Sequence, residues 1–143
     1  MHRLIASLYN QFYTNFSWAY DLAVWIGTGG LWYRWTFVAE RYLAADPVVE
    51  VGFGRGRLLT RLVKKGREVV GIDSSQQMVR AAKRQLRSDG ATGLLVHGRA
   101  QALPFPDASV GTLITTFPTS FVRDPATLRE FARVLRLSGC WYG

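Results

Sequence analysis

The sequence predicts an α/β fold, a doubly wound and mostly parallel sheet of about five strands preceded by N-terminal helices. From residue 48 onward, short apolar runs rich in β-branched residues alternate with amphipathic helical segments. The first of these runs ends in a cluster of glycines, and Gly or Asp-Pro pairs separate several of the later elements. Strands that alternate with helices form parallel sheets with right-handed crossovers. With 143 residues, 48% of them hydrophobic, the chain suits one folded domain.

The first 45 residues differ in composition from the rest. They hold four of the five Trp residues and most of the Tyr residues. We expect two helices here, over 4–26 and 31–44, which Gly29-Gly30 separates and Asp46-Pro47 terminates. The sequence therefore predicts an N-terminal helical and aromatic lid segment over residues 1–45 and a ligand-binding core over residues 46–143.

The core is predicted to contain four complete strands and the start of a fifth. The first three are short runs of apolar and β-branched residues. The fifth is expected to begin at Cys140, after a turn at Ser138-Gly139. The predicted strands cover residues 48–51, 68–72, 94–96, 110–116 and 140 onward.

Three helices are predicted between these strands. The first covers 57–65 and ends at Gly66. The second covers 74–88, with a capping box of Ser74 and Gln77, and ends at Asp89-Gly90. The third opens with Asp124-Pro125, in the usual order of cap and then proline. Its predicted buried side carries Leu128, Phe131, Ala132 and Leu135.

Composition restricts the chemistry and the setting. The single cysteine, Cys140, cannot form a disulfide within the chain, and His2 and His97 belong to no ligand motif, so we expect no metal site. A reducing, cytoplasmic location is the simplest fit. The longest apolar stretch, Leu22 to Tyr33, contains glycines and is too short to span a membrane.

The net charge of +8 predicts a generally basic surface, with attraction to an anionic partner as the alternative. On this interpretation Arg80, Lys83, Arg84 and Arg87 form a solvated helix face.

The strongest local signal is residues 50–56, Glu-Val-Gly-Phe-Gly-Arg-Gly, directly after the first strand. In doubly wound sheets, ligands bind at the carboxyl ends of the strands, where the strand order reverses. Glycines there let the backbone approach a ligand because no Cβ intervenes. A dinucleotide-binding turn would place its third glycine at position 57, which is Arg57, whereas the third glycine here is Gly56.

A second signal is Asp73, at the end of the second strand and about twenty residues after the glycines. A carboxylate in this position can accept hydrogen bonds from both hydroxyl groups of a ribose, and such charge-assisted bonds contribute roughly 1.5–3 kcal/mol each. Asp73 can also cap the helix that follows it.

Four motifs together resemble the class I S-adenosylmethionine-dependent methyltransferase family, whose fold is Rossmann-like. They are the acidic-x-Gly-x-Gly-x-Gly pattern at 50–56, Gly-Ile-Asp-Ser at 71–74 with Met78, the loop 98–105, and the turn 133–139. The resemblance spans residues 46–142 in order and spacing. The nearest subgroup is similar to the small-molecule ubiquinone and menaquinone methyltransferases, a match that includes Tyr20-Asp21.

The resemblance implies a role for each matching residue. Glu50 would orient the ammonium group of the methionine moiety, Asp73 would hold the ribose, and Ser74 and Ala100 would lie beside the adenine. Thr115 or Thr116 would line the methionine side, and Tyr20 would close over the cofactor. For Met78 and Tyr20 core packing is the competing interpretation, and for Arg99 a surface position; no catalytic residue is assigned. The predicted cofactor-binding residues are Glu50, Gly52, Gly54, Gly56, Asp73, Ser74, Met78, Arg99, Ala100, Thr115 and Tyr20.

The sequence departs from the family pattern in several places. Arg99 stands where the family usually has Asp, and Val110-Gly111 stands where it usually has Phe-Asp. Leu-Ser-Gly at 137–139 replaces the usual Pro-Gly-Gly. The family sheet has seven strands, so the chain is expected to be truncated at its C-terminus. Its fifth strand would then present an unpaired apolar edge with Trp141 and Tyr142, where another chain could pair.

The resemblance implies transfer of a methyl group from S-adenosylmethionine to a small apolar acceptor. The main alternative is a truncated or degenerate S-adenosylmethionine-binding module without catalytic activity. A nicotinamide-dependent oxidoreductase and an RNA methyltransferase are further alternatives. The expected partners are a small-molecule acceptor, a membrane surface contacted through the aromatic N-terminus, and a chain paired at the fifth-strand edge; nucleic acid is not expected.

Overall fold

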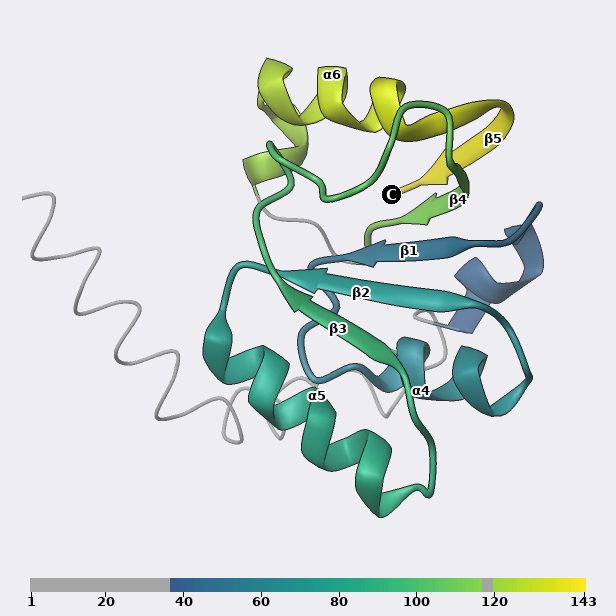
Figure 1. Cartoon of the computed structure of the whole chain (residues 1–143), viewed down its shortest axis with the longest axis vertical. Coiled ribbons are helices and arrows are strands. Elements are labelled where there is room, and N and C mark those ends of the chain that lie inside the picture. Colours follow the sequence, from purple (N-terminus) through teal and green to yellow (C-terminus); the bar gives the residue numbers. More distant parts are fainter. Residues whose placement is uncertain (1–36, 117–119) are drawn as a thin grey trace, which may run out of the picture. The chain divides into compact units, whose positions relative to one another are not determined.

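Five parallel strands form a single sheet in the order β3-β2-β1-β4-β5 (Figure 1). The structure is a computed structural model, and it describes residues 37–116 and 120–143. The predicted doubly wound, parallel α/β fold is confirmed. The predicted helix 4–26 and residues 31–36 of the predicted helix 31–44 lie outside the described residues; the described part of the latter is a 3-10 helix that ends at Tyr42. The division of the chain at residue 45 stays a prediction. The strands are β1 (Val48–Val51), β2 (Val69–Asp73), β3 (Leu94–His97), β4 (Val110–Ile114) and β5 (Leu135–Tyr142).

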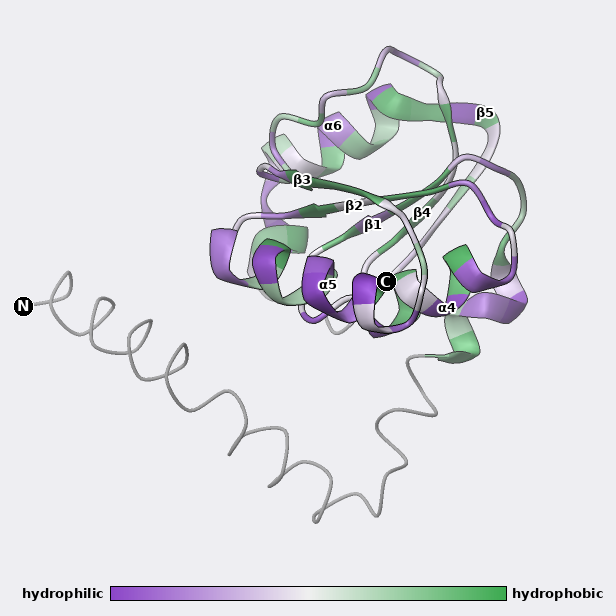
Figure 2. Ribbon diagram, turned by 60° about the horizontal axis from the view of Figure 1, so that its bottom comes forward, coloured by the Kyte–Doolittle hydropathy of each residue, from purple (hydrophilic) through white to green (hydrophobic). Residues whose placement is uncertain are grey.

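Helices cover both faces of the sheet. Helices α4 and α5 lie on one face and α6 lies on the other (Figures 1 and 2). The central strands β1 and β4 are buried along their whole length, as expected for strands covered on both sides. The helices are α4 (Arg57–Lys64), α5 (Gln76–Ser88) and α6 (Pro125–Val134), with the short 3-10 helices η1 (Phe37–Tyr42) and η2 (Ser120–Arg123).

The core is divided between these two faces. On the α4 and α5 side, leucines of α4 pack with Val79, Ala82 and Leu86 of α5 against the sheet. On the other side, Phe131 and Val134 of α6 pack against alternate residues of the same strands. Because neighbouring strand residues point to opposite faces, Val48 belongs to the first cluster and Val49 to the second.

Local signals at the helix ends are largely confirmed. Gly66 has a φ of 76° and follows the end of α4, as a left-handed C-terminal residue does. Asp124 caps α6 by accepting a hydrogen bond from the Ala126 N–H at 2.9 Å. For α5 the predicted cap is wrong by one residue, because Ser75 and not Ser74 accepts the Met78 N–H, at 3.4 Å.

Two predictions about the C-terminal part are wrong. The buried residues of α6 are Thr127, Phe131 and Val134, whereas Leu128 and Ala132 are exposed. Strand β5 begins at Leu135 and not at Cys140, because Leu135 already pairs with Val110 of β4, ahead of the pair formed by Cys140 and Thr112. The pairing of β4 with β5 is irregular between Val110 and Thr112, which accommodates the extra residues.

Gly111, one of the departures from the family pattern, has a packing reason. A Cβ at this position would lie 2.6 Å from the carbonyl oxygen of Ala45 and 2.7 Å from that of Asp46. The chain leading into β1 therefore passes so close to β4 that only glycine fits.

On the other side of β4, Trp141 of β5 donates a hydrogen bond from Nε1 to Thr115 Oγ1 at 3.0 Å and meets the Phe131 ring edge-on at 5.4 Å.

Within the part of the chain that the structure describes, no helix is long and apolar enough to cross a membrane.

Candidate functional site

The strand order places a candidate site at the carboxyl ends of β1, β2 and β4. The order reverses at β1, whose neighbours are β2 on one side and β4 on the other. Such a reversal opens a crevice between the loops that leave neighbouring strands in opposite directions. The loop Gly52–Gly56 leaves β1 here, Asp73 ends β2, and Thr115 and Thr116 follow β4. The structure thus brings together five of the predicted residues: Glu50, Gly52, Gly54, Asp73 and Thr115.

The glycine turn is closed by backbone hydrogen bonds. Gly52 donates to the Ile72 carbonyl at 2.7 Å, and Gly56 donates to the Phe53 carbonyl at 2.9 Å. Gly54 has a φ of 55°, and a Cβ built there would meet no atom within 4 Å, so this residue faces open space. Gly56 differs, because its Cβ would lie 2.8 Å from Cβ of Ala82 in α5. Gly54 therefore fits a ligand approach, whereas Gly56 is required for packing between helices.

The Asp73 carboxylate is oriented by two backbone groups. Its Oδ2 accepts the Gly54 N–H at 3.0 Å and its Oδ1 accepts the Ser75 N–H at 2.8 Å. Burial raises the pKa of Asp73, while these two hydrogen bonds and the nearby His97 lower it. A carboxylate offers about four lone-pair sites, so each oxygen retains capacity for a further donor. The arrangement suits a pair of hydroxyl groups.

The Glu50 carboxyl group is almost fully buried, with 1% of the residue exposed. Its Oε1 accepts a hydrogen bond from Thr116 Oγ1 at 3.1 Å, but its Oε2 has no hydrogen-bond partner among the described residues. Burial raises the pKa of Glu50 to about 8; the Thr116 hydroxyl and the Leu59 backbone at the start of α4 oppose this rise, and Asp73 adds to it. A buried polar atom without a partner is costly. A cationic donor that reached Oε2 would satisfy it and would favour the ionised form.

The two threonines after β4 have different surroundings. The Thr115 hydroxyl is engaged with β5, since it accepts from Trp141 Nε1 and lies 3.4 Å from the Tyr142 carbonyl. The Thr116 hydroxyl donates to Glu50. The residue after β4 that shapes the candidate site is therefore Thr116, which the sequence offered as the alternative to Thr115.

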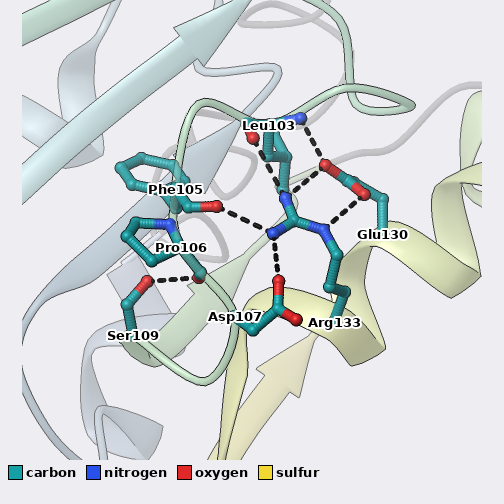
Figure 3. A network of polar contacts seen from close by, with 7 residues as sticks. All are labelled: Leu103, Phe105, Pro106, Asp107, Ser109, Glu130 and Arg133. Carbon is teal, nitrogen blue, oxygen red and sulfur yellow. Dashed lines mark hydrogen bonds and ion pairs between the residues drawn. The ribbon is translucent and has the colours of Figure 1, made fainter.

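The loop between β3 and β4 is clamped onto α6 (Figure 3). Arg133 donates to the carbonyl groups of Leu103 and Phe105, at 3.2 and 2.9 Å, and pairs with Asp107 at 2.7 Å. Glu130 pairs with Arg133 and also accepts the Leu103 N–H at 2.7 Å. Arg133 lowers the pKa of Glu130. These contacts fix the loop next to the end of β3, where the Gly98 N–H donates to the Asp73 carbonyl at 3.0 Å.

Within this loop the consecutive residues Arg99 and Ala100 have different surroundings. Arg99 is exposed and forms an isolated antiparallel bridge with Ala102. Ala100 is buried in the hydrophobic cluster on the α6 side, together with Val51 and Ile72.

The other predicted residues are Ser74, Met78 and Tyr20. Ser74 is exposed, and its carbonyl is 3.0 Å from His97 Nε2. Met78 is half-buried in the first turn of α5. Tyr20 lies outside the described residues. His97 is exposed, pairs in register with Asp73 and lowers the pKa of Asp73.

Phe121 of η2 is a neighbour of the site that the sequence did not indicate. Its ring lies 3.5 Å from where a Cβ on Gly52 would be. The only signal was an aromatic residue in the connection after β4. Among residues 37–116 and 120–143, no three His, Cys, Asp or Glu side chains cluster as a metal ion would require.

Comparison with known proteins shows that the chain is similar in sequence to methyltransferases. The model of the family described as "Methyltransferase domain" matches residues 48–139. An uncharacterised methyltransferase of Mycobacterium tuberculosis is 33% identical over 96 residues, which are 67% of this chain and 38% of that protein. A ubiquinone/menaquinone biosynthesis C-methyltransferase of Hahella chejuensis is 33% identical over 120 residues, which are 80% of this chain and 48% of that protein.

A solved structure extends the similarity over most of the chain. It is a methyltransferase of Thermotoga maritima, described as S-adenosylmethionine-dependent and a possible histamine N-methyltransferase. The TM-score is 0.70 at 22% identity, covering 92% of this chain and 58% of that one, so this likeness supports the fold alone. The chain spans about half or less of the length of the Mycobacterium and Hahella proteins.

Proposed function

Because this chain belongs to the methyltransferase-domain family of class I S-adenosylmethionine-dependent enzymes, we propose that it binds S-adenosylmethionine at the ends of β1, β2 and β4. We further propose that the protein transfers the methyl group to a small apolar acceptor. The observation that carries the proposal is the pair of carboxyl groups, Glu50 and Asp73, at the carboxyl ends of the neighbouring strands β1 and β2, next to an open glycine turn.

The donor set of the site fits the two ends of this cofactor. Asp73 has free lone pairs and an orientation fixed by the Gly54 and Ser75 N–H groups, which suits the two ribose hydroxyls. Glu50 has one oxygen without a partner among the residues that the structure describes, which suits the ammonium group of the methionine moiety. Gly54 presents backbone without a side chain between these two positions. The family's usual Asp at this position would accept a hydrogen bond from the adenine amino group. Arg99 is exposed and cannot accept this bond.

The bound cofactor would supply an already activated methyl group on its sulfonium. The work left to the protein is therefore to position the acceptor in line and to exclude water. No general base is needed for the proposal, and His97, the only His among the described residues, is engaged with the Ser74 carbonyl. An apolar acceptor is supported by the similarity to a protein named for ubiquinone and menaquinone biosynthesis. A cytoplasmic location stays a prediction.

A binding module without catalytic activity is the second candidate. It is favoured by the exposed position of Arg99. This module would bind the cofactor at the same residues but would not turn it over.

Titration calorimetry with S-adenosylhomocysteine tests the cofactor site. We expect micromolar binding, equivalent to about 8 kcal/mol, and a loss of about 100-fold or more in Asp73→Asn, because two charge-assisted hydrogen bonds are weakened. Asp89→Asn at the end of α5 is the matched control and should bind like the wild type. A folded chain that releases no heat, or equal losses in both variants, would contradict the proposal.

Turnover separates the two candidates. Radiolabelled S-adenosylmethionine is incubated with the chain and with a panel of quinone and phenol acceptors. Methylated product would establish the transferase. Cofactor binding without product from any acceptor would favour the binding module.

A further inference from the structure

Nearly all of the net charge of the chain lies on one helical layer. Residues 57–88 hold nine of the 18 basic side chains and two of the ten acidic ones, a net charge of +7 out of +8 for the whole chain. One of these two acidic residues, Asp73, is buried in the candidate site. The segment comprises α4, β2 and α5, and its two helices cover the same face of the sheet (Figure 2).

The basic residues form one exposed stripe on each helix. Neither α4 nor α5 contains an Asp or Glu. Like charges four residues apart, such as Arg80 with Arg84 and Lys83 with Arg87, destabilise a helix, so helix stability does not explain the pattern. Within the described part of the chain, no ion pair or hydrogen bond engages the charged groups of Lys64, Arg80, Lys83, Arg84 or Arg87. The exposed basic residues of this α4–α5 face are Arg57, Arg61, Lys64, Lys65, Arg80, Lys83, Arg84 and Arg87.

A hollow of about 620 Å³ lies within this face, between α4, η1 and the end of α5. Four of the basic residues line it, all from α4 and its C-cap. Thr60, also in its lining, is 4% exposed, and its shielded hydroxyl has no hydrogen-bond partner among the described residues. Glu40 neutralises part of the charge by pairing with Arg61 and Lys65, and Asp89 at the far end accepts from Gln85. The hollow therefore offers excess positive charge, which suits a phosphate.

Apolar side chains border the same hollow. Phe37 lines it and lies under the Arg61 guanidinium, 4.7 Å from the ring centroid. The neighbouring Val38 is 40% exposed. Basic residues beside exposed apolar ones are typical of surfaces that rest on a lipid bilayer. Single-stranded nucleic acid, in contrast, is held by aromatic residues that stack on bases, and α4 and α5 contain no aromatic residue.

We propose that the α4–α5 face binds an anionic phospholipid surface, with a lipid phosphate in the hollow that basic residues of α4 line. Lys and Arg near an anionic leaflet each strengthen binding roughly fivefold, so the unpaired residues of α5 alone hold the chain at the surface. This proposal gives a binding role to basic residues that the sequence analysis expected to form only a solvated helix face. It does not depend on methyl transfer, because none of the residues involved belongs to the candidate cofactor site.

Vesicle co-sedimentation of the 143-residue chain tests the proposal. Phosphatidylcholine vesicles with and without phosphatidylglycerol serve as probes, at low salt and at about 0.5 M salt. One variant combines Lys83→Gln, Arg84→Gln and Arg87→Gln. The matched control combines Arg123→Gln, Arg129→Gln and Arg136→Gln, which are exposed residues outside this face and give the same net charge. Circular dichroism of both triple variants confirms that they fold.

We expect binding only to vesicles with phosphatidylglycerol, lost at high salt. The α5 triple variant should lower the partition constant by about 100-fold, while the control triple retains most of the binding. Equal losses in the two triple variants, equal binding to both vesicle types, no binding to either, or binding to polyuridylate but not to vesicles would each overturn the proposal. Failure to bind S-adenosylhomocysteine would affect only the proposed function.

Discussion

The neighbouring strands β1 and β2 each bring a carboxyl group to the same end of the sheet, but their surroundings differ. Both oxygens of Asp73 accept backbone N–H groups. Glu50 has a single hydroxyl donor, and its second oxygen has no partner among the described residues. Burial raises the pKa of both groups, and for Glu50 it raises the pKa to about 8. The difference indicates that Asp73 is oriented to accept hydrogen bonds from neutral hydroxyl groups, whereas the second oxygen of Glu50 still needs a cationic donor.

The largest expected effect comes from Glu50→Gln. The pKa of Glu50 is higher in the folded chain, about 8, than its ordinary value of 4.5, so the folded state retains a proton that the unfolded state has lost between these pH values. Stability of the wild type should therefore fall as the pH rises through this window, by up to about 1.4 kcal/mol per unit. Glu50→Gln removes this contribution and should exceed the wild type in stability near pH 8.

Urea unfolding of both proteins near pH 5 and near pH 8 measures this difference. The comparison of the two proteins isolates Glu50, since other groups titrate in both. Parallel pH dependences would show that Glu50 ionises as readily in the folded chain as in the unfolded one.

A smaller effect is expected from Thr116→Val, which removes the one hydroxyl donor to Glu50. Leaving Oε1 without a partner should cost about 1–2 kcal/mol of unfolding free energy and should raise the pKa of Glu50 further. Thr116→Ser keeps the hydroxyl and serves as the control. If the valine and serine variants unfold at the same urea concentration, this hydrogen bond contributes nothing to the environment of Glu50.

The smallest effect on stability is expected from Gly54→Ala. Its φ of 55° should cost about 1 kcal/mol, and Gly90→Ala, at a φ of 64° and likewise in open space, should cost the same. Only Gly54→Ala places a methyl group beside Asp73, so only it should weaken S-adenosylhomocysteine binding, by about tenfold, or about 1.4 kcal/mol. Calorimetry on both variants checks this, and equal affinities would remove Gly54 from the site.

Features set by local chemistry were predictable from the sequence. The left-handed Gly66 and the Asp124-Pro125 cap both follow from the conformations that these residues favour, and the structure confirms them. The positions of Glu50, Asp73 and the glycines at the same sheet edge also followed, because parallel strands end together.

Features set by tertiary packing were not predictable. The sequence favoured Leu128 over Thr127 as a buried residue of α6 because leucine is the more hydrophobic, yet Thr127 is the buried one, and its hydroxyl has no partner among the described residues. The start of β5 was missed because Leu135 joins the sheet by pairing with Val110, a long-range contact that leaves no local signal before the irregular stretch that contains Ser138-Gly139. Whether Thr115 or Thr116 faces Glu50 depends on where β4 ends and on the contact with Trp141.

The most direct test of the account is the titration of the Glu50 carboxyl group by carbon-13 NMR, without and with saturating S-adenosylhomocysteine. Glu50 is one of four glutamates in the chain, and Glu50→Gln assigns its signal. The account predicts a pKa of about 8 in the free protein and a lower pKa in the complex, where an ammonium group pairs with Oε2. A pKa near 4.5 in the free protein, or one that the ligand leaves unchanged, would contradict it.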